Sequence, residues 1–350
     1  MKILLVSPLP PPNGGIASWT ERFLEYSEQN NLACKVVNTA VIGDRISSFS
    51  ERKHFFAEVK RTLCILKNYC ATLRVFAPDI IHINTSCSPT GLLRDYACVL
   101  MTHRKSKIVV HCRCTVEDQL KVKKWAKNVF SRLAKRADMI FVLNDASIRS
   151  IRELAGKEAI KVPNFIRKDY VIKEKKSIND EVKRLVYTGH ILHSKGVDEI
   201  LSAAKMLPQK TFVLAGTISE EYAKRELPPN VIMTGNLDSR AVCEQLDKAD
   251  VFLFPSYTEG FSNSLAEAMA RGLPVITTKV GANEDMLEDR GGVYVPIGDA
   301  NAIVKAVNLI ERSEIRRYMS EWNVRKTENS YCIERVMHQL TSLYKEVLQE

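Results

Sequence analysis

The sequence predicts an α/β protein made of two doubly wound domains, each with a parallel sheet covered by helices on both faces. Three observations support this. The chain has 350 residues, which is more than one hydrophobic core usually serves. Short runs rich in β-branched residues alternate with longer segments of helical periodicity. Glycine and polar residues follow many of these runs, where loops at the carboxyl ends of strands are expected.

Nine strands are expected, four in the first half of the chain and five in the second. The runs are Lys2–Ser7, Ile80–Asn84, Lys107–Cys112, Met139–Leu143, Lys183–Gly189, Lys210–Gly216, Val231–Gly235, Val251–Ser256 and Pro274–Thr278. Since most of them are followed by a loop and a helix-forming stretch, the strands should lie parallel, with helices on both faces of each sheet.

The domain boundary is expected between Val162 and Lys173, where apolar periodicity gives way to turn residues and charge. We therefore assign residues 1–168 to an N-terminal domain and residues 169–329 to a C-terminal domain. In doubly wound sheets ligands bind at the carboxyl ends of the strands, so a site is expected in the cleft between two facing domains.

The composition, with 45% hydrophobic and 26% charged residues, is that of an ordinary globular protein without repeats or low-complexity segments. The apolar run that ends at Ser7 is too short for a signal-peptide core, and no later run is long enough to span a membrane. Nine scattered cysteines without a C-x-x-C pair indicate reduced thiols. We therefore expect a cytoplasmic protein.

Neither a metal nor a cofactor is expected. The segment His111-Cys112-Arg113-Cys114 resembles part of a zinc motif, but no second cluster completes four ligands. No D-x-D element stands at a strand end, which favours chemistry without a divalent ion. No G-x-G-x-x-G and no P-loop pattern occurs, which argues against dinucleotide oxidoreductases and P-loop enzymes.

The net charge of +10 is concentrated in the first half of the chain. Residues 1–168 contain 28 Lys and Arg against 14 Asp and Glu, whereas residues 169–350 contain 23 against 27. The basic half is therefore expected to meet an anionic partner, which could be nucleic acid, an acidic membrane surface or a phosphorylated substrate.

One basic segment, residues 119–136, predicts an amphipathic helix. Its apolar positions at helical spacing are Val122, Trp125, Val129 and Leu133. We expect this stripe to face the core and the basic flank to lie on anionic lipid at the inner face of the membrane. Nucleic acid is the remote alternative, but no zinc finger, aromatic-interleaved basic motif or recognition-helix pattern supports it, and we expect no nucleic-acid partner.

Two loops fit a phosphate-binding role. Gly14 and Gly15 follow the first expected strand and precede a helix, so that backbone and helix N-terminus can approach an anion closely. A flexible turn is the alternative. His190 and Lys195 lie in the loop after the strand that ends at Gly189, where a diphosphate could be held. A solvated loop lysine is the alternative there.

The segment from Glu259 to Glu267 carries the strongest chemical pattern. A buried strand ends at Ser256, Glu259 lies in the following loop, and Ser262 or Asn263 can cap a helix that contains Glu267. Both carboxylates should therefore stand at the carboxyl edge of the sheet. Glu259 is well placed to accept hydrogen bonds from sugar hydroxyls.

Two alternatives to this interpretation stay open. The pattern Ser264-x-x-Glu267 also matches a capping box, in which Glu267 would only satisfy a backbone amide. Paired carboxylates also occur in glycosidases. The fold pattern and the diphosphate-type loops favour transfer from an activated sugar over hydrolysis.

With its E-x7-E element from Glu259 to Glu267, the chain resembles the retaining glycosyltransferases of family 4 over nearly its full length. The resemblance implies a GT-B fold, that is, α/β with two doubly wound Rossmann-like domains whose parallel sheets face each other across a cleft. It implies that residues 1–168 bind the acceptor and residues 169–329 the nucleotide sugar. It also implies that a final helix, around residues 330–350, packs back on the first domain.

The resemblance assigns roles to the motif residues of the second domain. Glu259 would contact the transferred sugar and Glu267 the ribose of the nucleotide. Lys195 would neutralise the diphosphate. Sugar and phosphate would be held by the backbone of Phe261, Ser262 and Asn263, and the base would be bordered by Gly235, Asn236 and Leu237.

In the first domain, the resemblance places Gly15 beside the donor phosphates and Asn13 and Gly14 beside the acceptor. His111 would lie near the reacting face of the sugar, which makes it a candidate catalytic residue together with Glu259 and Lys195.

The sequence departs from the family pattern at two places. His190 stands where an Arg is usual in the diphosphate loop, and Gly281-Ala282 stands where Gly-Gly is common. A neutral His190 can donate a hydrogen bond, but it would stabilise a leaving diphosphate less than a permanent cation does.

Together these features predict a hexosyltransferase that uses a nucleotide-diphosphate sugar as co-substrate, retains configuration and needs no metal. The expected acceptor is a glycan or lipid-linked glycan in lipopolysaccharide, capsule or exopolysaccharide biosynthesis. Other GT-B enzymes, such as a nucleotide-sugar epimerase or a glycogen-synthase-type enzyme, are the alternatives.

Overall fold

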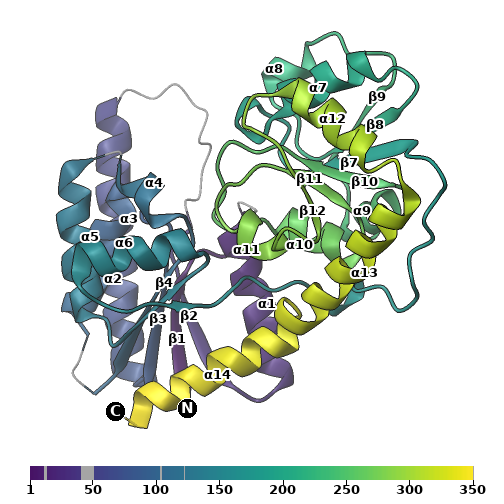
Figure 1. Cartoon of the computed structure of the whole chain (residues 1–350). Coiled ribbons are helices and arrows are strands. Elements are labelled where there is room, and N and C mark those ends of the chain that lie inside the picture. The colour runs from purple at the N-terminus through teal and green to yellow at the C-terminus, as the bar shows by residue number, and fades with distance from the viewer. Residues whose placement is uncertain (12–13, 41–50, 103–104, 122, 350) are drawn as a thin grey trace. The chain divides into compact units, whose positions relative to one another are not determined.

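A computed structural model describes residues 1–11, 14–40, 51–102, 105–121 and 123–349. Its internal contacts divide the chain into two compact units (Figure 1). Unit 1 consists of Met1–Val162 with Met337–Glu350, and unit 2 consists of Pro163–Val336. The chain thus passes from unit 1 to unit 2 after Val162, six residues before the domain boundary that we assigned from the sequence at residue 168.

Unit 1 contains a six-stranded parallel sheet in the order β2-β1-β3-β4-β5-β6. Its strands are β1 (Lys2–Ser7), β2 (Ala33–Asn38), β3 (Ile80–Thr85), β4 (Lys107–Cys112), β5 (Met139–Val142) and β6 (Ile160–Lys161). Its helices are α1 (Gly15–Gln29), α2 (Glu51–Phe76), α3 (Pro89–Leu100), α4 (Val116–Leu120), α5 (Lys124–Arg136), α6 (Asp145–Ala155) and most of α14 (Ile333–Gln349). All six residues of β3 are buried, as expected for a strand in a sheet covered on both faces.

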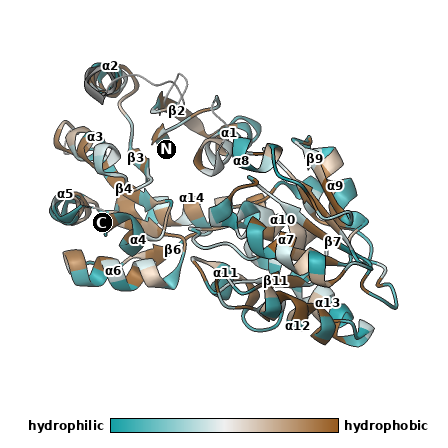
Figure 2. Ribbon diagram, turned by 90° about the horizontal axis from the view of Figure 1, so that it is seen from above, coloured by the Kyte–Doolittle hydropathy of each residue, from teal (hydrophilic) through white to brown (hydrophobic). Residues whose placement is uncertain are grey.

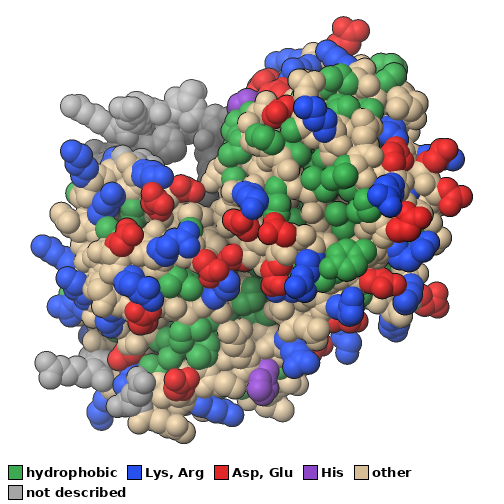
Figure 3. Space-filling view, viewed as in Figure 1, with side chains coloured by type: hydrophobic (Ala, Val, Ile, Leu, Met, Phe, Trp, Pro, Cys, Tyr) green, Lys and Arg blue, Asp and Glu red, His purple; other side chains and the backbone are tan. Residues whose placement is uncertain are grey.

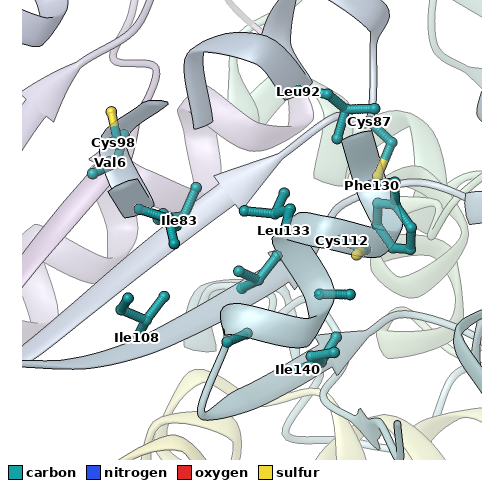
Figure 4. Packing of buried hydrophobic residues seen from close by; sticks show 14 of the residues in the cluster. Val6, Ile83, Cys87, Leu92, Cys98, Ile108, Cys112, Phe130, Leu133 and Ile140 are labelled. Atoms are coloured by element: carbon teal, nitrogen blue, oxygen red, sulfur yellow. The ribbon is translucent and has the colours of Figure 1, made fainter. Parts of the chain in front are cut away.

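The two faces of this sheet differ in character. One face packs aliphatic and cysteine side chains against α2, α3, α5 and α6, and Figure 4 shows part of this cluster, including Ile83 and Ile108 of the sheet with Phe130 and Leu133 of α5. The opposite face carries histidine rings, which lie against aromatic side chains of α1 and α14. The histidine side chains of the sheet, His82 and His111, therefore both lie on the second face.

Unit 2 contains a second six-stranded parallel sheet, in the order β12-β11-β10-β7-β8-β9. Its strands are β7 (Arg184–Thr188), β8 (Thr211–Ala215), β9 (Val231–Gly235), β10 (Val251–Phe254), β11 (Val275–Thr277) and β12 (Gly292–Tyr294). Its α-helices are α7 (Val197–Met206), α8 (Glu220–Ala223), α9 (Ser239–Asp247), α10 (Asn263–Ala270), α11 (Asn283–Leu287), α12 (Ala300–Leu309) and α13 (Ser313–Ser330). Short 3-10 turns are formed by Lys168–Tyr170 and His193–Lys195. In Figure 2 many of the helices carry both hydrophilic and hydrophobic residues, as expected for helices that cover a sheet.

All nine strands expected from the sequence are present, and three further strands were missed. Strand β2 alternates between exposed and partly buried residues over Ala33–Val36 and buries only Val37, so it lacks a continuous apolar run. Strands β6 and β12 have only two and three residues, which is too short for a periodic signal.

The prediction of which residues form the buried face of the basic helix was partly wrong. Helix α5 buries Ala126, Phe130, Leu133 and Ala134, whereas Trp125 is 40% exposed. The buried positions follow a second helical pattern, spaced by three and four residues, that includes small alanines. Val129 is partly buried, and Val122 lies outside the described residues.

All nine cysteines are free thiols. In the described part of the chain, no helix combines the length and the apolarity that crossing a bilayer requires.

Candidate functional site

The sheet of unit 2 has a topological switch point between β7 and β10. The chain runs from β7 outward to β8 and β9 and then returns to place β10 on the other side of β7. Ligands of such sheets bind at the carboxyl ends of the strands at this point. Lys195 lies in the loop after β7 and Glu259 in the loop after β10, so the topology alone brings two candidate catalytic residues to one place.

Lys195 and Glu259 form an ion pair there. Lys195 Nζ lies 2.5 Å from Glu259 Oε1, and the two side chains are 27% and 10% exposed. The hydroxyl of Ser256 donates a second hydrogen bond to the same carboxylate oxygen at 2.8 Å. Lys195 is therefore not a solvated loop charge, and the Glu259 carboxylate is oriented by the protein itself.

Gly196 explains how the Lys195 loop reaches the end of β10. It has φ +73, and a Cβ at this position would lie 2.1 Å from the carbonyl oxygen of Pro255. The backbone N–H of Tyr257 donates to the carbonyl of Ser194 at 3.0 Å. Because only glycine permits this approach, the loops after β7 and β10 interlock immediately beside the ion pair.

Gly281 fixes the Glu259 loop from its other side. It follows β11, has φ +56, and a Cβ there would lie 2.2 Å from the carbonyl oxygen of Glu259. The backbone N–H of Ala282 donates to the carbonyl of Gly260 at 3.0 Å. The family often has Gly-Gly at positions 281 and 282. Only the first glycine, Gly281, is required for steric reasons, and Ala282 fits as a buried residue.

Helix α10 begins directly after this loop. Ser262 is its N-cap, and its hydroxyl accepts a hydrogen bond from the backbone N–H of Leu265 at 3.1 Å. Asn263 is the first helical residue, and its side-chain oxygen accepts a bond from the amide of Asn164 at 2.9 Å. Phe261 is 8% exposed and packs edge-on against Tyr331, with ring centroids 5.3 Å apart.

The capping-box alternative for Glu267 is wrong. Helix α10 starts at Asn263, so Ser264 lies inside the helix and the cap is supplied by Ser262 instead. Glu267 lies in the second turn and is half-buried.

The carboxyl ends of β7, β8 and β9 approach one another through glycines. Gly189, Gly216 and Gly235 have φ +146, +145 and +72, and a Cβ on Gly216 would lie 1.9 Å from the carbonyl oxygen of Gly189. The backbone N–H of Gly216 donates to the carbonyl of Gly235 at 2.9 Å. His190 follows as an exposed residue whose carbonyl accepts a bond from the Tyr187 hydroxyl at 2.8 Å.

The residues expected to border a base lie at this same edge, at the end of β9. Asn236 is exposed, and its side-chain oxygen accepts a hydrogen bond from the Thr217 hydroxyl at 2.8 Å. Leu237 is half-buried. Strands β7 and β8 separate β9 from β10, so Gly235, Asn236 and Leu237 belong to a different part of the edge from Glu259.

In unit 1, Gly14 and Gly15 open helix α1. Gly14 is the N-cap, with extended backbone, no side-chain cap bond and no acidic residue in the first turn of the described helix. A Cβ on Gly14 would meet no described atom within 4 Å, so its backbone borders open space. Asn13, the other expected acceptor residue, lies outside the described residues.

His111 is a fully buried residue of β4. Its ring contacts Trp19, His82 and Phe141 at centroid distances of 6.0, 5.3 and 5.6 Å. Burial, and then the charge of Arg113, hold the pKa of His111 well below its ordinary value, so the imidazole is neutral. It belongs to unit 1, whereas the other two candidate catalytic residues belong to unit 2, and its role at a sugar stays a prediction.

Sequence reasoning assigned no role to three residues that shape these sites. Ser256 orients Glu259, and the only signal was a serine at the end of a strand. Gly196 stood directly after Lys195 without being recognised as the contact point of two loops. Arg113 was considered only as part of a zinc-like segment. Within the described residues, no group of three or more His, Cys, Asp or Glu side chains could hold a metal ion.

Comparison with known families decides the class of this enzyme. Residues 169–327 match the family described as glycosyl transferases group 1. The chain carries a glycosyl transferases group 1 domain. It is therefore a glycosyltransferase, as the sequence predicted, and the matched residues include the ion pair, helix α10 and the glycine-lined edge of unit 2.

The glycosyltransferase is 22% identical to the capsular polysaccharide biosynthesis glycosyltransferase CapM of Staphylococcus aureus, over 93% of each chain. The structure of sucrose-phosphate synthase from Thermosynechococcus elongatus covers all of both chains with a TM-score of 0.79 at 15% identity. HepE of Anabaena, solved in complex with UDP and glucose, covers 99% of both chains with a TM-score of 0.72 at 16% identity. These similarities confirm the predicted two-domain GT-B fold.

Proposed function

We propose that this glycosyltransferase moves a hexose or N-acetylhexosamine from a nucleotide-diphosphate sugar to a lipid-linked glycan, with retention of configuration. The process would be the biosynthesis of a surface polysaccharide, such as lipopolysaccharide, capsule or exopolysaccharide. The observation that carries the proposal is the Lys195–Glu259 pair at the switch point of unit 2. The capsular role in the name of the Staphylococcus aureus relative and the UDP and glucose bound to HepE support it.

The ion pair suits the charges that develop during transfer. The bond between the anomeric carbon and the diphosphate oxygen breaks, while an acceptor hydroxyl forms the new bond and gives up its proton to the leaving diphosphate. The diphosphate gains negative charge and the sugar becomes cation-like. Lys195 would neutralise the negative charge of the leaving diphosphate. Glu259 would accept hydrogen bonds from the hydroxyls of the cation-like sugar.

The remaining donor contacts are proposed along the same edge of unit 2. The backbone of Phe261, Ser262 and Asn263 would hold sugar and phosphate at the N-terminus of α10, where helix N–H groups favour anions. Glu267, which is not needed as a cap, would bind the ribose. In this account fixed protein groups neutralise the diphosphate without a divalent ion. His190 would donate a hydrogen bond to it.

The base would lie at the end of β9, beside Gly235, Asn236 and Leu237. In unit 1, Asn13 and Gly14 would contact the acceptor and Gly15 the donor phosphates, with His111 supporting the reacting face of the sugar. These assignments rest on the resemblance to family 4.

We further propose that unit 1 attaches to the inner face of the membrane through α5. The exposed side chains at the start of this helix include its N-cap Lys123 with Lys124 and Lys127, next to Trp125, which is 40% exposed. Lys and Arg side chains stand along the α5 edge of unit 1 in Figure 3, interspersed with Asp and Glu. Lysines beside an exposed tryptophan match the chemistry of an anionic lipid surface.

A thermal-shift panel of UDP-, GDP- and ADP-sugars tests the donor site. We expect one nucleotide class to raise Tm, because a ligand at a hundredfold excess over its Kd stabilises the folded protein by about 2.7 kcal/mol. Lys195→Gln should lose most of this rise, whereas Lys224→Gln, an exposed lysine of unit 2, should keep it. Equal shifts in both variants would contradict the diphosphate role of Lys195.

Product analysis with and without an acceptor glycan separates the alternatives. Transfer that depends on the added acceptor supports the proposal. Conversion of the nucleotide sugar without acceptor would indicate an epimerase, and growing polymers of the donor sugar would indicate a glycogen-synthase-type enzyme.

A further inference from the structure

Arg113 is a buried cation at the carboxyl end of β4 in unit 1, with an exposed fraction of 8%. Its guanidinium lies over the ring of Trp19, with Cζ 4.4 Å from the ring centroid. Nη1 donates to Nδ1 of His111 at 3.2 Å, since Nε2 of this ring donates to the carbonyl of Val162. The other terminal nitrogen, Nη2, has no hydrogen-bond partner among the described residues.

The neighbours of Arg113 do not neutralise it. Burial, and then the charge of Arg113, lower the pKa of His82 to about 3, and the pKa of His111 is held well below its ordinary value for the same reasons. Burial lowers the pKa of Arg113 itself to about 9, so the guanidinium stays charged at neutral pH. Within the described residues only burial and the Tyr344 hydroxyl shift the pKa of Arg113, and no carboxylate does. A buried charge without a counter-charge is costly to fold, unless a ligand supplies the missing partner.

The N-terminus of helix α1 is a second source of positive potential, about one helical turn from Trp19. Trp19, which carries the guanidinium on its ring, is the fifth residue of this fifteen-residue helix. The first turn of α1 has no acidic residue and its N-cap, Gly14, forms no side-chain cap bond. Free N–H groups of a helix N-terminus attract anions, and a guanidinium matches the geometry of phosphate oxygens.

We propose that Arg113 and Gly14, the N-cap of α1, bind a phosphate group of the acceptor. The inference rests on the proposed function, because it specifies the acceptor as a phosphate ester rather than a neutral glycan. Arg113 is then a specificity-determining residue that selects phosphorylated acceptors. The excess of Lys and Arg over Asp and Glu in residues 1–168 is consistent with an anionic substrate on this half of the chain.

The three tryptophans of the chain provide a readout that needs no donor sugar and no catalysis. The indole N–H resonances of Trp19, Trp125 and Trp322 are assigned in 15N-labelled protein with Trp125→Phe and Trp322→Phe. Inorganic phosphate is then titrated at constant ionic strength. We expect a saturable shift of the Trp19 resonance, while the resonances of exposed Trp125 and of Trp322 in unit 2 stay in place.

Substitutions of Arg113 test whether its side chain binds the phosphate. Arg113→Gln should weaken phosphate binding at least tenfold, and Arg113→Lys, which keeps the charge but not the planar fork, should weaken it less. Arg132→Gln removes the same charge from an exposed position of α5 and should leave the titration unchanged. If Arg113→Gln does not fold, the Arg113→Lys titration carries the comparison with wild type.

Further probes identify the phosphate source. Glucose 1-phosphate represents a soluble sugar phosphate and citronellyl diphosphate a prenyl-linked acceptor, and tighter binding of either one at Trp19 supports the site and names its source. Acetate that binds more tightly than phosphate would overturn the proposal in favour of a carboxylate. Unchanged phosphate binding in both Arg113 variants would also overturn it. Since no transfer is measured, either result is distinguishable from a failure of the proposed glycosyltransferase reaction.

Discussion

At the scale of single residues, the candidate donor site depends on glycines that let three loops touch. Gly196 brings the Lys195 loop against Pro255, and Gly281 brings the loop after β11 against Glu259. In both cases an added Cβ would fall closer than 2.5 Å to a backbone carbonyl oxygen. The position of the Glu259 carboxylate is therefore set by backbone contacts that no other residue type allows.

We predict that Gly281→Ala lowers transfer activity at least tenfold. Its left-handed backbone costs of order 1 kcal/mol for alanine, and the new methyl group must also displace the Glu259 backbone. Gly156→Ala, in unit 1 and outside the candidate site, is the matched control, because it has φ +63 but open space around its Cβ position. Urea unfolding measures the backbone cost in both variants, and kcat measures the displacement. Equal kcat values in the two variants would show that the contact with Glu259 does not position the site.

The sequence predicted Lys195 and Glu259 separately, but not that they pair. Their contact depends on β10 lying beside β7, and strand order is not visible in a single sequence. The capping alternative for Glu267 could be removed only once the first residue of α10 was known. Arg113 escaped notice because an unpaired buried charge is defined by its surroundings rather than by its neighbours in sequence.

At the scale of elements, α5 shows why helical periodicity alone misplaced one face. Trp125 and Leu133 share a helical spacing, yet only Leu133 is buried. Alanines at 126 and 134 allow close packing on the sheet, so the helix turns these small residues inward and leaves Trp125 outside beside the lysines. Helical spacing alone takes no account of which side chains are small enough to pack closely on the sheet, and it therefore assigned Trp125 to the core.

We predict that α5 binds anionic vesicles. Each Lys near an anionic surface contributes about 1 kcal/mol, so replacing Lys123, Lys124 and Lys127 by Gln should weaken binding about a hundredfold. Liposome flotation measures this, and Trp125→Ala should weaken binding further. The triple replacement of Lys205, Lys224 and Lys248, which are exposed in unit 2, removes the same charge and should have little effect. Equal recovery of wild type with neutral and anionic vesicles would count against the attachment.

At the scale of the whole molecule, the chain begins and ends in unit 1. Residues from Met337 onward belong to this unit, where Leu340, Tyr344 and Val347 are buried. The Tyr344 hydroxyl lies 2.5 Å from Nδ1 of His82 on β3. The C-terminal segment therefore completes the core of a unit whose other residues precede Pro163.

We predict that deletion of residues 337–350 destabilises unit 1 selectively. Each lost large apolar side chain removes roughly 1.5–3 kcal/mol of burial, so the effect should reach several kcal/mol. Hydrogen exchange should show lost protection in β3 and β4, with β10 and β11 of unit 2 still protected. Tyr344→Phe, which removes only the hydroxyl, is the mild control. Equal loss of protection in both sheets would contradict this account.

The two-sheet architecture was predictable because each sheet is built from buried runs separated by helical segments, as in β3, β4, β7 and β10. The missing strands, β2, β6 and β12, are partly exposed or very short and leave little pattern in the sequence. The first division between the units falls at Val162, inside the segment where periodicity stops. Fold class is thus set by many weak signals that agree, whereas the site depends on a few contacts between distant residues.

The most direct test of the central claim is transfer by Glu259→Gln, measured with the donor that the nucleotide-sugar panel identifies. The amide keeps the shape of the side chain but removes the charge that pairs with Lys195 and the second acceptor oxygen for sugar hydroxyls. We predict a fall in kcat of about a hundredfold or more, with an unchanged urea midpoint. Glu226→Gln, an exposed carboxylate of unit 2, should transfer at the wild-type rate. Near-normal transfer by Glu259→Gln would contradict the account.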